Sequence, residues 1–156
     1  MTDDRETVSY DTVREHIAPC GLNCTKCIAH SDGDIRHLSS ALADALGPNF
    51  GAYAQRFSAA NPAFEGYEAF RTLLDHLAGG SCASCRSGEC PFFPCRVREC
   101  VQEQEVDFCF QCELFPCDRS GMSGRLLEIW RNNNENMKEL GAVEYYLKVQ
   151  NLPRYP

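Results

Sequence analysis

The sequence predicts a mainly α-helical single domain with irregular, cysteine-rich metal-binding loops and at most a small amount of β structure. Apolar residues recur at intervals of three and four in several segments, which is the spacing of one helix face. Alternating runs of β-branched residues, typical of half-buried strands, are almost absent. The cysteines fall in stretches interrupted by glycine and proline, which favour loops. A chain of 156 residues suits one compact domain with a modest core.

The first half of the chain predicts an acidic N-terminal segment, residues 1–15, and a helical insert, residues 32–78. The insert begins with a stripe of helical spacing that ends at Gly47-Pro48. Residues 50–58 predict a short helix, and a longer one begins near Pro62, with Asn61 as its N-cap and Gly79-Gly80 as its stop. The two stripes consist of Ile35, Leu38, Leu42, Ala45 and Leu46, and of Phe64, Tyr67, Phe70, Leu73, Leu74 and Leu77.

The second half predicts a cysteine cluster, residues 82–117, followed by C-terminal helices within residues 120–150. Residues 96–105 have helical propensity, which places Cys100 on a helix and Cys95 at its start. Helical spacing continues over residues 120–140, with Gly141 as the terminator, and residues 142–149 predict a last short helix. Residues 16–150 are therefore expected to form one cysteine-rich domain.

Charge and composition exclude several functional classes. Lys and Arg number 15 against 22 Asp and Glu, giving a net charge of −7, which is the wrong sign for gripping phosphate backbones. A nucleic-acid partner is therefore not expected. The N-terminal residues carry no apolar stretch of the signal-peptide kind, and no run approaches the roughly 18 apolar residues of a membrane span. We expect a cytoplasmic protein without a membrane partner.

The 11 cysteines are the feature that demands an explanation. Three CxxC pairs occur, and each places two sulfur atoms within reach of one tetrahedral metal ion. Because cytosolic thiols are kept reduced and an odd number cannot pair completely, a disulfide framework is the weaker interpretation. The sequence predicts zinc ligands at Cys20, Cys24, Cys27, Cys82, Cys85, Cys90, Cys95, Cys100, Cys109, Cys112 and Cys117.

The number of candidate ligands does not decide how the cysteines are divided among metal sites. Two four-ligand sites use eight cysteines, whereas three sites need twelve ligands and therefore one further residue, for which His30 is the candidate. The N-terminal triplet of Cys20, Cys24 and Cys27 must borrow a fourth ligand from the later cluster. The spacing Cys-x2-Cys-x4-Cys occurs from Cys82 and again from Cys109, either as a duplicated half-site or by chance.

The same thiolates suit an iron-sulfur cluster, so spacing alone does not identify the metal. The triplet from Cys20 has the spacing of radical SAM enzymes, but Lys26 replaces the usual aromatic residue and the chain is too short for that barrel. A zinc hydrolase would need an open coordination position and usually histidine or carboxylate ligands, and histidine is scarce. Arg96 and Arg98 are either surface arginines or partners of a negative metal-thiolate centre.

The ordered cysteine motifs resemble those of the DUF3795 family of small bacterial and archaeal proteins. Four segments carry the resemblance: residues 18–27, 82–85, 95–100 and 108–117. All of the predicted ligands except Cys90 fall on the family pattern. The resemblance implies a cysteine-rich, zinc-binding protein without an established activity, and it supplies no catalytic residues.

The sequence therefore predicts that residues 16–150 form a zinc-binding domain with two or three structural ions. The absence of a glycine-rich phosphate loop, a GxSxG elbow and an HExxH pair favours an interaction module over an enzyme. The expected partner is another protein. The alternative is an iron-sulfur redox or sensor protein that uses the same cysteines.

Overall fold

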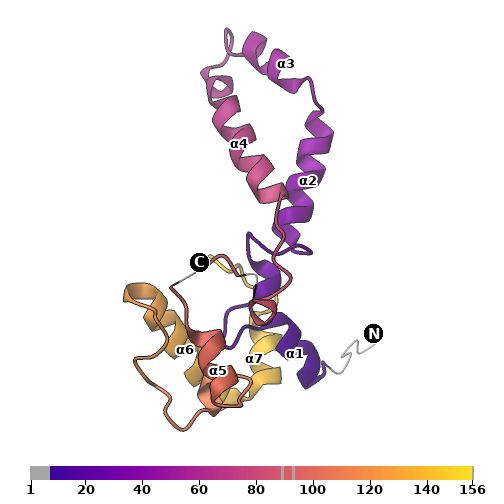
Figure 1. The fold of residues 1–156 in the computed structure, drawn as a ribbon. Coiled ribbons are helices and arrows are strands. Elements are labelled where there is room, and N and C mark those ends of the chain that lie inside the picture. Colours follow the sequence, from indigo (N-terminus) through magenta and orange to yellow (C-terminus); the bar gives the residue numbers. More distant parts are fainter. Residues whose placement is uncertain (1–7, 89, 93, 156) are drawn as a thin grey trace. The chain divides into compact units, whose positions relative to one another are not determined.

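The computed structural model describes residues 8–88, 90–92 and 94–155, and it confirms the mainly helical fold class (Figure 1). The backbone falls into two compact units. Unit 1 contains the described residues up to Thr25 and those from Ala83 onward, and unit 2 contains residues 26–82. The β structure in the described residues is limited to two isolated bridges, Ile17 with Asn23 and His30 with Cys82. None of the described helices is both long and apolar enough to cross a bilayer.

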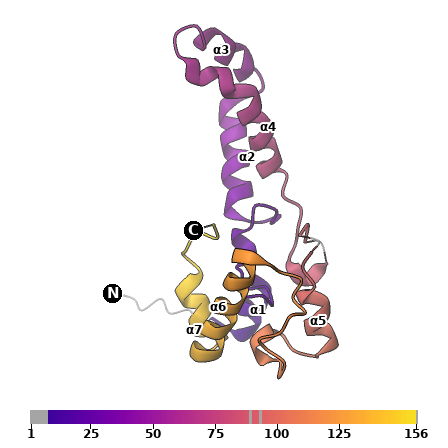
Figure 2. The same ribbon diagram turned by 90° about the vertical axis from the view of Figure 1, so that its left-hand side faces the viewer.

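Unit 2 consists of α2 (Asp34–Leu46), α3 (Phe50–Phe57), a 3₁₀ turn (Pro62–Gly66) and α4 (Tyr67–Ala78). The helices predicted in the insert are thus confirmed. Asn61 is the N-cap, as predicted, because its side chain accepts the Ala63 N–H at 3.0 Å. The first turn after this cap is 3₁₀ rather than α, so the long helix begins only at Tyr67. The antiparallel helices α2 and α4 lie side by side (Figures 1 and 2).

The two large residues in the middle of the apolar stripe that predicts α2 are not buried in unit 2. Ser39 is buried, whereas Leu38 is 70% exposed and Leu42 is 45% exposed. In α4, Leu74 is 4% exposed but its neighbour Leu73 is 56% exposed. The hairpin therefore buries small residues of α2 and leaves large apolar residues on its surface.

Unit 1 contains α1 (Tyr10–His16), α5 (Val97–Glu103), α6 (Gly124–Leu140) and α7 (Ala142–Val149). Helix α1 lies inside the segment expected to be merely acidic; Ser9 caps it by accepting the Thr12 N–H at 3.1 Å. Helix α6 begins four residues later than the predicted residue 120, and Gly121 before it has a φ of 72°, outside the range of the interior of a right-handed helix. The last helix matches its predicted bounds.

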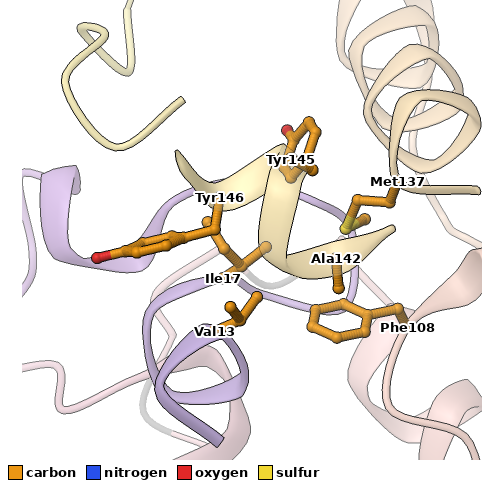
Figure 3. Close-up of a cluster of buried hydrophobic side chains, with 7 residues drawn as sticks. All are labelled: Val13, Ile17, Phe108, Met137, Ala142, Tyr145 and Tyr146. Atoms are coloured by element: carbon orange, nitrogen blue, oxygen red, sulfur yellow. The ribbon is translucent and has the colours of Figure 1, made fainter. Parts of the chain in front are cut away.

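The apolar core of unit 1 joins α1, α6, α7 and the segment before Cys109 (Figure 3). Its side chains converge from these elements around the fully buried Ile17 and Phe108. Tyr145 adds a buried hydrogen bond by donating its hydroxyl to the Gly21 carbonyl at 2.7 Å. This bond ties α7 to the loop that carries Cys20. The core consists of Val13, Ile17, Phe108, Met137, Ala142, Tyr145 and Tyr146.

Candidate metal centre

The described cysteines of unit 1 include two groups of four thiols. The first thiol group consists of Cys20, Cys24, Cys85 and Cys95, which lie within electrostatic range of one another. They pack in an apolar cluster that also includes Cys109 and Cys117. The second thiol group consists of Cys100, Cys109, Cys112 and Cys117, which line one cavity. All 11 cysteines are free of disulfide bonds.

The cavity among the second thiol group measures about 20 Å³. A space of that size holds about one water-sized particle. Apart from the four thiols and Gln104, its wall is apolar and consists of Val101, Val106, Phe115 and Trp130. A space for one particle that is lined by four cysteine residues suits a single ion better than a multi-atom cluster.

Short local hydrogen bonds hold the second thiol group in place. Cys109 opens a 3₁₀ turn (Cys109–Gln111), and the Cys112 N–H donates to its carbonyl at 3.1 Å. The Gln111 side-chain oxygen accepts the N–H groups of Asp107 and Phe108 at 2.9 and 3.0 Å. The Cys109 N–H donates to the Pro19 carbonyl at 3.1 Å, so the loops of the two thiol groups are joined through their backbones.

Trp130, the single tryptophan of the chain, is 1% exposed and lies against this cavity. Its Nε1 makes no hydrogen bond of good geometry with a described residue, although it is close enough to Cys109 to lower the pKa of that thiol. Phe115 packs edge-on against its ring at 5.2 Å between centroids. A buried N–H close to a sulfur atom suits a thiolate, which is a better acceptor than a thiol.

The first thiol group depends on two tight loops. Residues 17–23 form a hairpin-like loop in which Gly21 has a φ of 86°, and a Cβ added to it would lie 2.5 Å from the Asn133 Cβ. A Cβ on Gly121, also at positive φ, would lie 2.1 Å from the Pro94 carbonyl oxygen. The Arg96 N–H donates to the Ser120 carbonyl at 2.9 Å in the same region. Only glycine fits these two close approaches.

Arg86 connects the two thiol groups and was not singled out by the sequence analysis. It follows Cys85 directly, and its guanidinium donates to the carbonyls of Arg14 and Asp107 at 2.9 Å each and to that of Ile17 at 3.4 Å. It also lies over the Phe108 ring, 5.1 Å from the centroid. Its acceptors are backbone carbonyls distant in sequence, so no local motif could have revealed this role.

Burial makes the thiols poor acids in the structure as described. Loss of solvent raises the pKa of Cys20 and raises those of Cys85 and Cys109 to about 12. Burial also raises the pKa of Cys100, which Arg119 partly offsets. Uncompensated thiolates are therefore disfavoured at these positions, and a bound cation would supply the missing charge.

Three predicted ligands lie outside these two groups as defined. Cys27 and Cys82 fall in unit 2, so the Cys-x2-Cys-x4-Cys repeat that begins at Cys82 is divided between the two units. Cys90 is exposed, within electrostatic range of Cys85 and Cys95. His30 Nδ1 accepts the Asp32 N–H at 3.1 Å. Because Nδ1 is engaged as an acceptor, only Nε2 of this ring is open to a metal.

The side chains do not surround an ion as they are placed here. Within residues 8–88, 90–92 and 94–155, no three Cys, His, Asp or Glu side chains are arranged so that they could hold a metal ion. The fold thus gathers thiols from three segments between helices and from helix α5 into common neighbourhoods, without forming a coordination sphere among the described side chains. The donor chemistry, the small cavity and the orphaned indole N–H fit a metal ion, and the sulfur positions require adjustment.

Residues 16–122 match a family model described as a protein of unknown function (DUF3795). The match covers more than half of the chain and includes all of the cysteines. No curated protein and no solved structure matches the chain.

Proposed function

The chain belongs to the DUF3795 family, and we propose that it is a zinc-binding protein whose two tetrathiolate sites fix the loops of unit 1 for interaction with another protein. The observation that carries this proposal is the cavity of about 20 Å³ lined by all four members of the second thiol group. The family description assigns no function, so the proposal rests on the residues of this chain.

Zinc in a structural site takes four ligands in a tetrahedron, with Zn–S distances of about 2.3 Å. The second thiol group offers this donor set from helix α5, a 3₁₀ turn and the following loop. We expect the sphere to close when the cysteine side chains rotate about χ1 between staggered positions. The Trp130 N–H would then donate to a Cys109 thiolate.

The first thiol group offers a second set of the same kind. Cys20 and Cys24 come from the loop after α1, whereas Cys85 and Cys95 come from the segment before α5. An ion held by these four would join parts of the chain separated by about sixty residues. Two such ions use eight cysteines and leave Cys27, Cys82 and Cys90 outside the coordination spheres.

The metal has a physical task in this fold. Helices α1 and α5 have seven residues each, which is too short for stability in water without tertiary support. Zinc binding by four thiolates supplies on the order of 10 kcal/mol, which is folding free energy when the site forms only in the folded chain. Four protein ligands also leave no open position for a substrate, which favours an interaction role over catalysis.

Elemental analysis of the reduced, purified chain tests the proposal. We expect two zinc ions per wild-type chain, one per chain for Cys112→Ala, and two for the matched control Cys90→Ala, which alters the exposed thiol. The control separates site loss from a general effect of removing a cysteine. Iron with acid-labile sulfide and absorbance near 400 nm would instead identify the iron-sulfur alternative. A metal-free protein, or equal losses in both variants, would contradict the proposal.

A further inference from the structure

One side of the α2–α4 hairpin in unit 2 exposes large apolar side chains. Leu38 and Leu42 on α2 are 70% and 45% exposed, and Phe70 and Leu73 on α4 are 42% and 56% exposed. These intervals of four and three residues are those of a continuous helix stripe. We call these four residues the open face.

Helix geometry places both stripes on the same side of the hairpin. The least exposed positions of α2 centre on Ser39, and those of α4 on Leu74, which marks the sides on which the two helices pack. At about 100° per residue, each exposed stripe lies roughly a quarter turn from the packed side, in the same rotational sense. Antiparallel helices are related by a twofold axis, so equal rotations lead to one common side.

The hairpin cannot bury this apolar surface by itself. Only Ser39, Ala54 and Leu74 among the helical residues of unit 2 described here are buried. On α2 the exposed Ala45 and Ala41 continue the stripe around the helix, away from the packed side, so the helix is apolar over more than one face. Helices with two apolar faces are typical of four-helix bundles, in which each helix contacts two neighbours.

We propose that the open face binds the open face of a second copy of this chain, so that two α2–α4 hairpins form a four-helix bundle. With Ala41 and Ala45 the face offers roughly 400 Å² of apolar surface. A standard interface buries about 800 Å² per partner, of which about two thirds is apolar in a homodimer. The open face therefore offers most of the apolar area that a homodimer interface of standard size buries.

The chemistry of the face favours a second copy over a charged partner. Neither stripe contains a charged residue, so the open face carries no charge that could pair with a charged partner surface. A twofold dimer requires only a self-complementary patch, and a second copy is present wherever the chain is made. The proposal involves unit 2 alone and does not depend on metal in unit 1.

Sedimentation velocity on the full chain, with zinc and a thiol reductant present, tests the proposal. We expect a concentration-dependent monomer–dimer equilibrium in the wild type. Leu38→Glu and Leu73→Glu each place a carboxylate in the interface and should raise the dimer dissociation constant at least about tenfold. Both positions are mostly exposed in the single chain, so the monomer should keep its helical content, which circular dichroism checks.

Leu152→Glu is the matched control, because Leu152 is 53% exposed but belongs to unit 1. It should leave the dissociation constant unchanged. A wild-type chain that stays monomeric throughout the micromolar range would overturn the proposal and leave the face to a different protein. A dimer that survives both open-face substitutions, or that Leu152→Glu disrupts equally, would also overturn it.

Discussion

Arg86 should be a large contributor to the stability of unit 1, although it is a half-buried arginine in a short 3₁₀ turn (Cys85–Ser87). Replacing Arg86 with alanine removes two hydrogen bonds of 2.9 Å, a longer one of 3.4 Å and the stacking on Phe108. Hydrogen bonds from a charged donor contribute about 1.5–3 kcal/mol, and the low end applies at partial exposure. Stacking contributes about 0.5–1 kcal/mol.

These contributions add to about 3–4 kcal/mol. The desolvation cost of burying the guanidinium, which the alanine variant does not incur, must be subtracted from this sum. We therefore expect Arg86→Ala to lower the free energy of unfolding by about 2–3 kcal/mol. For a chain of this size, that corresponds to a fall in Tm of roughly 5–10 °C. Arg86→Lys should lose about half as much, because an ammonium group cannot reproduce the planar fork that reaches separate carbonyls.

Urea unfolding followed by Trp130 emission is the appropriate assay, since the single tryptophan reports on unit 1. Arg125→Ala, at an exposed position on α6, is the control and should change stability by less than about 0.5 kcal/mol. If Arg86→Ala behaved like this control, or if Arg86→Lys matched the wild type, the role assigned to the guanidinium would be wrong.

Two further substitutions test the loops and the cavity. Gly21→Ala should lower the free energy of unfolding by at least about 1 kcal/mol more than Gly141→Ala does. Both glycines have a φ of 86°, but only Gly21 lies against Asn133. Equal losses in urea unfolding would show that backbone strain alone matters. Trp130→Phe should weaken zinc binding about tenfold by removing the N–H donor beside Cys109. Competition with a chromophoric chelator measures this change, and an affinity within about twofold of the wild type would contradict it.

Local sequence signals predicted most of the helices. The helix of residues 142–149 and the cap at Asn61 follow from spacing and short-range hydrogen bonding, which act between neighbours in the chain. Helix α1 was not predicted, because a helix of seven residues with one buried side chain, Val13, gives too weak a periodic signal. The stripe of α2 predicted a helix correctly, but periodicity does not tell which side meets α4, and Leu38 is largely exposed.

The thiolate ligands that the cysteine spacing indicates remain a prediction, whereas their grouping was left open by the sequence. The division of the unit 1 thiols into two groups of four depends on how loops meet in space. The Cys109 N–H bond to the Pro19 carbonyl joins residues ninety positions apart, and no spacing rule anticipates it. The positions of Arg86 and Trp130 follow from the same long-range packing.

The backbone at the base of the helical insert gives the chain a modular construction. The Cys82 N–H donates to the Ala29 carbonyl at 2.8 Å, and the Ser31 N–H donates to the Cys82 carbonyl at 2.9 Å. The backbone segments at the start and at the end of the insert therefore lie next to each other. A segment that leaves and re-enters at one point can be lengthened, shortened or exchanged with little demand on its surroundings. Residues 31–81 are in this sense a cassette, a convenient position for grafting a foreign hairpin or a reporter.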